Sequence, residues 1–204
     1  MCFSATTSFI SSALLLLISC ATILKAGMNS KKLMFAAIPL LFSIQQACEG
    51  LIWNALTSNQ SALIYTYIYL FFVFIVWPLW MPISVMRISA IKNNMFFIPL
   101  ASGILVALSG LIAAFYTTPI PLIMEHHIYY SFDLPQSFYT LGTIAYLIAT
   151  ITPFFLSTVP FMYIMGILIG VSYAISYIFY YQFILSIWCF FAAILSIIVV
   201  KIIW

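Results

Sequence analysis

Charged residues are so scarce in this chain that they constrain its fold more than any motif does. Only 4% of its 204 residues are Asp, Glu, Lys or Arg, whereas 66% are hydrophobic. A water-soluble domain needs about a quarter charged residues to cover its surface. The composition therefore excludes a soluble globular protein and predicts an integral membrane protein whose main partner is the lipid bilayer. The net charge of +3 comes without a basic patch or base-stacking module, so nucleic-acid binding is not expected.

Long apolar runs alternate with short polar or glycine-containing breaks. A transmembrane helix needs about 20 apolar residues to cross ~30 Å of hydrocarbon. Runs of this length predict an all-α fold, a single transmembrane domain over residues 1–204 built as a bundle of seven helices. The predicted helices cover residues 5–25, 33–56, 62–86, 95–116, 138–157, 161–181 and 183–203.

The distribution of charge predicts how this bundle is oriented. With seven helices, Glu125 and Asp133 fall on one side of the membrane and every Lys and Arg falls on the other. The positive-inside rule then places the N-terminus outside and the C-terminus in the cytosol. An even number of helices would break this agreement. The basic residues are Lys25, Lys31, Lys32, Arg87, Lys92 and Lys201.

Glu49 lies inside the second predicted helix, roughly 10 Å below its outer end at 1.5 Å per residue. Gln45, Gln46 and Trp53 are its neighbours at helical spacing. An ionised carboxylate at that depth costs several kcal/mol unless it is paired. Glu49 is therefore expected to be protonated, hydrogen-bonded by the glutamines, in contact with water, or bound to a metal. The plain alternative is a neutral acid that only joins helices.

Both histidines of the chain lie side by side in the outer connection, within the run MEHHIYY at 124–130. Neutral imidazole is the commonest metal-ligating side chain. His126 and His127 would point in different directions from a helix or a strand, so joint binding of one ion needs an irregular backbone. Prolines at 119, 121 and 135 favour one. The alternative is a polar interfacial loop with Tyr129 as an anchor.

The chain begins MCFSA, and removal of the initiator Met would leave Cys2 with a free α-amine. Its thiolate and amine could chelate a soft or borderline metal, or form a nucleophile with its own base. The alternative is a chance cysteine near the end of the chain.

The predicted topology puts these three features on the same side of the membrane. Because bundled helices pack ~8–10 Å apart, Cys2, Glu49, His126 and His127 could be the ligands of one metal ion in an outward-facing pocket. One sulfur, two imidazoles and a carboxylate suit zinc best, and iron or copper also accept them. Either Glu49 or Glu125 would serve as the catalytic base. The residues expected around the ligands are Gln45, Gln46, Trp53, Tyr129, Tyr173 and Tyr177.

Three segments together resemble an uncharacterised prokaryotic family of multi-pass membrane proteins. These are MCFSATTSF at the start, AAIPLLFSIQQACEGLIW at 36–53, and the HHIYY run. The likeness covers chiefly the first 130 residues and implies the cytoplasmic (inner) membrane of a prokaryote, but it brings no established activity. The positions that it highlights are Cys2, Gln45, Gln46, Glu49, Gly50, Trp53, His126 and His127.

Several functions are compatible with these residues. The leading hypothesis is a metal-centred membrane protein, including a metalloenzyme acting on a small or lipidic substrate, in which a zinc-bound water with a pKa near 7 supplies the nucleophile. A proton- or cation-coupled transporter or channel using Glu49 is the alternative, as is a structural membrane subunit. Haem bound through His126 or His127 ranks lower, because a second axial histidine from another helix is missing. The sequence is also compatible with a homo-oligomer.

Overall fold

The computed structural model describes residues 4–27, 30–89, 94–133 and 135–204. Within these ranges, seven helical stretches are long and apolar enough to cross a membrane, which confirms the predicted fold class. The stretches are Ala5–Ala26, Lys31–Thr57, Leu63–Ile88, Asn94–Tyr116, Tyr139–Leu156, Met162–Phe179 and Tyr181–Ile203.

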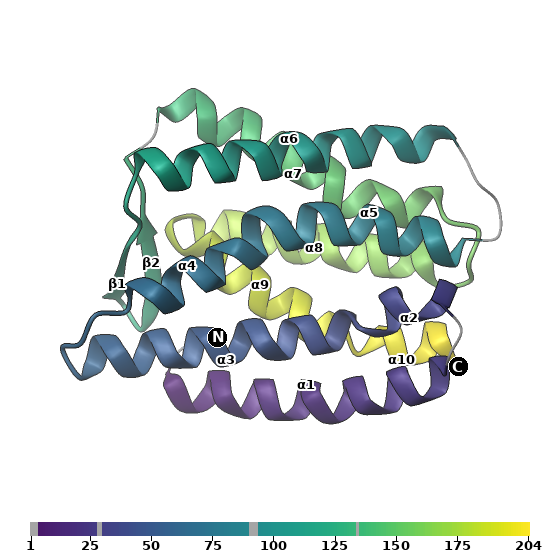
Figure 1. Cartoon of the computed structure of the whole chain (residues 1–204), viewed down its shortest axis with the longest axis horizontal. Helices are drawn as coiled ribbons and strands as arrows, with labels where there is room; N and C mark the ends of the chain where they lie inside the picture. The colour runs from purple at the N-terminus through teal and green to yellow at the C-terminus, as the bar shows by residue number, and fades with distance from the viewer. Residues whose placement is uncertain (1–3, 28–29, 90–93, 134) are drawn as a thin grey trace.

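Local breaks divide some of these stretches into shorter elements (Figure 1). In chain order, the elements are α1 (Ala5–Ala26), α2 (Ser30–Ala36), α3 (Ile38–Thr57), α4 (Leu63–Phe71), the π-helix η1 (Phe72–Val76), α5 (Trp77–Ile88), η2 (Asn94–Phe96), α6 (Phe97–Tyr116), β1 (Ile120–Met124), β2 (His127–Ser131), α7 (Gln136–Leu156), α8 (Met162–Phe179), η3 (Tyr181–Phe183), α9 (Ile184–Leu195) and α10 (Ile198–Ile203).

The long helices run roughly side by side, and the two ends of the bundle differ (Figure 1). At one end the strands β1 and β2 cross the bundle, and we call it the hairpin end. At the other end α1 finishes near the C-terminus, where the Lys25 ammonium lies 5.3 Å from the centre of the Trp204 ring. We call this the basic end, since Lys25 and Lys201 belong to it.

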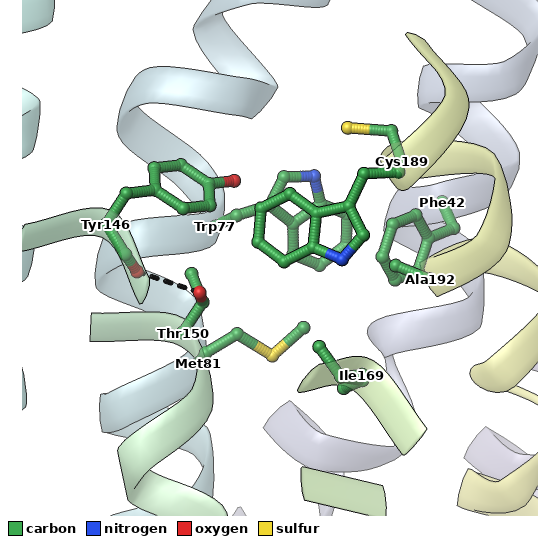
Figure 2. A pocket seen from close by; sticks show the side chains of 9 residues that line it. Phe42, Trp77, Met81, Tyr146, Thr150, Ile169, Cys189 and Ala192 are labelled. Atoms are coloured by element: carbon green, nitrogen blue, oxygen red, sulfur yellow. Dashed lines mark hydrogen bonds between the residues drawn. The ribbon is translucent and has the colours of Figure 1, made fainter. Parts of the chain in front are cut away.

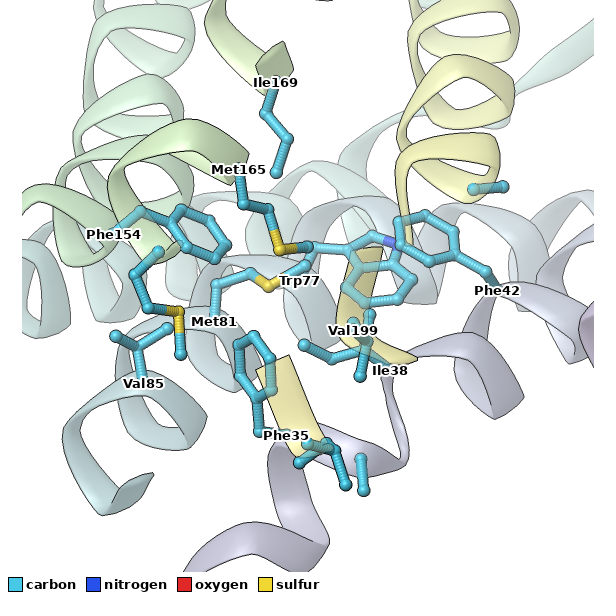
Figure 3. Packing of buried hydrophobic residues seen from close by; sticks show 14 of the residues in the cluster. Phe35, Ile38, Phe42, Trp77, Met81, Val85, Phe154, Met165, Ile169 and Val199 are labelled. Atoms are coloured by element: carbon cyan, nitrogen blue, oxygen red, sulfur yellow. The ribbon is translucent and has the colours of Figure 1, made fainter. Parts of the chain in front are cut away.

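The bundle interior is filled by interlocking apolar side chains from most of the helices (Figure 3). Phe42 of α3 stacks on Trp77 of α5, with 3.9 Å between their ring centres. Met81 and Met165 lie beside them and are almost completely buried. Flexible thioether side chains suit such irregular gaps between rings. This core fixes α3, α5, α8 and α9 relative to one another.

The third spanning stretch contains a π-helical turn, η1, where the hydrogen-bond ladder widens. The Trp77 backbone N–H donates to the Phe72 carbonyl, five residues back instead of four. Pro78 follows directly, and because it has no N–H it cannot donate to the carbonyl of Phe74. Gly103 of α6 packs against this distorted turn, since a Cβ atom there would lie 2.0 Å from the Pro78 carbonyl oxygen. The proline accounts for the distortion, and the glycine makes room for it.

The connection that the sequence places on the outer side differs from the irregular loop that its prolines favoured. Residues Ile120–Met124 and His127–Ser131 form a regular antiparallel hairpin, with Met124 paired to His127. The irregular backbone is confined to the two turn residues, Glu125 (φ 47°) and His126 (φ 64°). Positive φ at both central residues is the geometry of the tight turns that match strand twist. Strand pairing thus satisfies the backbone groups that a long loop would leave unpaired.

Candidate functional site

Glu49 is completely buried in α3 and lies in the hairpin half of the bundle. Its Oε1 accepts a hydrogen bond of 2.5 Å from the Ser186 hydroxyl, near the start of α9. At 100° per residue, Gln46, Glu49 and Trp53 fall within one narrow stripe of α3. This stripe differs from the face that carries Ser43 and Gly50, which pack on α1 at Ser12 and Phe9. Glu49 therefore points into the bundle, as its sequence position predicted.

Polar side chains from three other helices surround this stripe. The Trp77 indole N–H donates to Gln45 Oε1 at 2.7 Å. The Cys189 thiol of α9 lies close enough to Gln45, Tyr69 and Glu49 to interact with all three. We call Gln45, Gln46, Glu49, Trp53 and Ser186 the Glu49 cluster. It joins α3 to α9, and Trp77 links it to α5.

The π-helical turn explains how Tyr69 and Trp77 both reach this region. They are eight residues apart, which in an α-helix would turn their side chains about 80° from each other. A π turn accommodates one extra residue. Tyr69 and Trp77 are therefore oriented like two residues seven apart in a regular α-helix, which is about two full turns. Both side chains therefore face α3 and α9, where the Tyr69 hydroxyl donates to the Leu185 carbonyl at 3.0 Å.

Several polar atoms of the Glu49 cluster are buried without a hydrogen-bond partner among the residues that the structure describes. They are Gln45 Nε2, both amide atoms of Gln46 and the indole nitrogen of Trp53. A buried polar group costs about 1–3 kcal/mol when it stays unsatisfied. Three of these atoms are N–H donors, on residues that lie about one helical turn from Glu49 in α3. Such donors can hold an anion, a carbonyl oxygen or a metal-bound water.

His127 is the buried histidine of the hairpin, and it faces the connection between α8 and α9. Its ring centre lies 4.8 Å from that of Phe183 and 5.5 Å from that of Tyr180. Burial lowers the pKa of His127 below its usual range; neighbouring His126 acts in the same direction, while Glu125 opposes it. The neutral imidazole, which is the form that binds metals, is therefore favoured.

The same short segment of chain contacts His127 and Glu49. Phe183 touches the His127 ring, and Ser186, one helical turn later, donates to Glu49. On its other face, β2 places Ile128 and Tyr130 in the apolar cluster that holds Trp53 and Tyr69. The hairpin thus packs against the part of the bundle that holds Trp53 of the Glu49 cluster and the start of α9.

The other predicted site residues have different surroundings. Glu125 and His126 occupy the exposed turn, so the structure does not bring them to Glu49. Tyr129 is half-buried on β2. Tyr173 and Tyr177 stack on each other, and the Tyr173 ring packs edge-on against Trp188. These two tyrosines therefore belong to an aromatic row along α8 and α9.

The predicted set of metal ligands is only partly covered by the structure, because Cys2 lies outside the described residues. Among the residues that are described, no three His, Cys, Asp or Glu side chains are grouped closely enough to hold a metal ion. Glu49 and His127 are the two predicted ligands that the fold buries at the hairpin end.

A small cavity of about 30 Å³ lies deeper in the bundle (Figure 2). It is lined by Phe42, Trp77, Met81, Tyr146, Thr150, Ile169, Trp188, Cys189 and Ala192. Its walls are mainly aromatic and aliphatic, and the Thr150 hydroxyl is engaged with the Tyr146 carbonyl at 2.8 Å. Trp77 and Cys189 belong to both the cavity wall and the surroundings of Gln45. The cavity therefore adjoins the Glu49 cluster on the side away from the hairpin.

Sequence reasoning selected Glu49, Gln45, Gln46 and Trp53 but missed Ser186 and Cys189. In the described part of the chain, half of the serines in the spanning helices bond to a carbonyl of their own helix, as Ser172 and Ser176 do. No local pattern separates Ser186 from them. The distinction comes only from how α9 packs on α3.

Seven apolar spanning stretches and a carboxylate buried among them define a multi-pass integral membrane protein. The chain belongs to the family DUF6629, which is described as a family of unknown function. The model of this family matches residues 1–204. This agrees with the likeness to an uncharacterised family seen in its motifs. Comparison with curated proteins and with solved structures found no match.

Proposed function

We propose that this protein binds a divalent transition metal ion, with zinc favoured, at the hairpin end of the bundle. The ligands would be the Glu49 carboxylate, the His127 imidazole and the Cys2 thiolate. One observation carries the proposal: Glu49 and His127, from distant parts of the sequence, are both buried and both contact the segment from Phe183 to Ser186. The positive-inside rule would place this end outside the cytosol.

The surroundings of the two residues support a metal more than a purely structural role. A buried carboxylate and a neutral imidazole are both zinc ligands, and three protein ligands leave a fourth position for water or substrate. The N–H groups of Gln45, Gln46 and Trp53 are suited to hydrogen-bond a water or an anionic oxygen at that position. If a zinc-bound water is present, its pKa near 7 makes it a nucleophile for hydrolysis. The substrate would be small or lipidic, because the site lies within the membrane.

Of the two adjacent histidines, we assign the ligand role to His127. His126 lies on the exposed turn, with the positive φ that directs the chain back into β2. The two residues thus form a matched pair of the same chemistry in opposite environments. This pair makes the proposal testable without a known substrate.

The experiment is elemental analysis of the full-length protein purified in detergent without added chelator. We expect about one equivalent of zinc in the wild type and in His126→Gln, and loss of it in His127→Gln, Glu49→Gln and Cys2→Ser. Size-exclusion profiles and circular dichroism would confirm that each variant is folded. Metal-free, folded wild-type protein after growth with zinc, iron and copper would refute the proposal. So would equal metal content in the two histidine variants.

A second candidate is proton- or cation-coupled transport through Glu49. It is favoured by the cavity beyond Trp77 and Cys189, because its 30 Å³ exceeds the roughly 10–15 Å³ that one water needs. The cavity would then extend a path from Glu49 towards the middle of the bundle, although its mainly apolar walls give a water few hydrogen-bond partners. Ion or proton uptake into proteoliposomes, lost in Glu49→Gln and kept in His127→Gln, would favour transport over the metal site.

A further inference from the structure

The strand β1 is unusually apolar for a segment outside the spanning helices. Its residues are Ile-Pro-Leu-Ile-Met, and all but Pro121 are exposed. The exposed fractions are 55% for Ile120, 45% for Leu122, 40% for Ile123 and 41% for Met124. A soluble loop that exposed four large apolar side chains within five residues would form a hydrophobic patch needing a partner.

Burial on the two strands is strongly asymmetric. His127, Ile128 and Tyr130 of β2 are buried against α9, η3 and the apolar cluster around Tyr69. Each buried β2 residue faces an exposed β1 residue or Pro121 across the hairpin. β2 therefore supplies the buried side chains of the hairpin, whereas β1, whose backbone runs beside α3 and α4, keeps four large apolar side chains exposed.

Two features indicate that the hairpin lies at the level of the bundle where a membrane would meet water. In Figure 1, the end of α3 and its connection to α4 extend beyond the hairpin. Exposed tyrosines also gather at this end, at Tyr116, Tyr139, Tyr177 and Tyr181. Tyrosine side chains are enriched where a membrane meets water, because the ring is apolar and the hydroxyl is polar.

The chemistry of β1 excludes both bulk water and the hydrocarbon core as its surroundings. Its apolar side chains disfavour water. Its backbone pairs only with β2 among the described strands, so its outer edge has polar groups that hydrocarbon would leave unsatisfied. The boundary between lipid headgroups and acyl chains satisfies both requirements, because water and headgroups reach the backbone while acyl carbons cover the side chains.

We propose that β1 lies in this boundary layer and contacts membrane lipid, so that lipid anchors the hairpin where it packs on the bundle near Trp53 of the Glu49 cluster. The exposed polar turn, Glu125 and His126, would lie on the water side of the same layer. Exposure, backbone pairing and the level of the hairpin do not depend on a metal, so this position of β1 holds whether or not a metal is bound. It implies that a molecule entering beside β1 would come from the bilayer.

The test is photo-crosslinking with p-benzoylphenylalanine introduced at Leu122 in the full chain, reconstituted in phosphatidylethanolamine–phosphatidylglycerol vesicles. Leu105, 63% exposed in the middle of α6, is the lipid-facing control, and Ser61, exposed in the connection after α3, is the water-facing one. Mass spectrometry would detect lipid adducts, and gel electrophoresis would detect crosslinked dimers.

We expect a lipid adduct at Leu122 with a yield comparable to that at Leu105 and well above that at Ser61. A lipid yield at Leu122 no higher than at Ser61 would overturn the proposal, because β1 would then face water. A crosslinked dimer without lipid adducts would overturn it as well, since a second copy of the chain would cover the strand. Adducts at Leu122 that persist in the folded Glu49→Gln variant would show that lipid contact is independent of the metal proposal.

Discussion

The hydrogen bond between Ser186 and Glu49 gives the sharpest test of the chemistry of the buried acid. Ser186 donates to Glu49 at 2.5 Å, and both residues are completely buried. Replacing Ser186 by Ala removes the donor and leaves the carboxyl group with one partner fewer. Replacing Glu49 by Gln keeps the shape and an acceptor oxygen but removes the acid. The two changes, singly and together, form a double-mutant cycle.

The expected size of the coupling depends on whether Glu49 is ionised. A hydrogen bond to a charged group contributes about 1.5–3 kcal/mol, against about 0.5–1.5 kcal/mol for a neutral pair. Ser186→Ala should therefore lower the free energy of unfolding by about 1.5–3 kcal/mol if Glu49 is a carboxylate. In the Glu49→Gln background, the same change should cost about 1 kcal/mol. A coupling of about 0.5–2 kcal/mol, the difference between these two values, would mark a charged acceptor, and a coupling near zero would mark a neutral acid.

The assay is equilibrium unfolding by SDS in mixed micelles, followed by tryptophan fluorescence, in protein treated with chelator. Ser176→Ala is the matched control, because Ser176 is also completely buried but donates only to the Ser172 carbonyl of its own helix. Ser176→Ala should lower the free energy of unfolding by only about 0.5 kcal/mol, because the Ser172 carbonyl keeps its backbone hydrogen bond within the helix. If Ser186→Ala were no more destabilising than Ser176→Ala, the hydrogen bond would not hold α9 against α3, and the cluster described above would lose its anchor.

Two further predictions concern the packing and the turn. Gly103→Ala should lower the free energy of unfolding by about 1–3 kcal/mol, because the new Cβ atom would lie 2.0 Å from the rigid Pro78 carbonyl oxygen. Thermal unfolding would measure this loss of stability. Gly142→Ala, which has no heavy atom within 4 Å of the new Cβ, should instead be neutral or stabilising. Replacing Glu125 by Asn together with His126 by Gly should stabilise the protein by about 1 kcal/mol, since Asn-Gly suits positive φ at both turn positions. An unchanged thermal unfolding midpoint in this double variant would argue against backbone strain at the hairpin turn.

The spanning helices were predictable because the membrane imposes the rule that governs them. Hydrocarbon accepts only apolar side chains and fully bonded backbone, so length and composition suffice to count them. The hairpin was not predictable in this way. The run from Ile120 to Ser131 is apolar and aromatic almost throughout and lacks the Asn-Gly or Asp-Gly turn that indicates a hairpin. Its turn is formed by Glu125 and His126, residues that disfavour positive φ.

Glu49 could be identified from sequence because an acid within an apolar run has no ordinary explanation. Its partners could not, because they depend on the rotation of neighbouring helices about their own axes. A one-residue change in register would turn Ser186 about 100° away from α3. Sequence alone does not fix that rotation when most exposed and buried positions are equally apolar. The sequence also pointed to the histidine pair as candidate ligands, which stays a prediction, and only the strand register distinguishes buried His127 from exposed His126.

The π-helical turn shows how a local defect can determine the composition of a distant site. Pro78 has no backbone N–H to donate. Next to it, the helix forms an i to i−5 hydrogen bond from the Trp77 N–H to the Phe72 carbonyl. The resulting rotation aligns Tyr69 with Trp77, so that one helix contributes both the Trp77 donor to Gln45 and the Tyr69 neighbour of Cys189. In a regular α-helix, only one of the two rings could face α3 and α9. The distortion, the glycine that accommodates it and the polar cluster are therefore one connected feature of the fold.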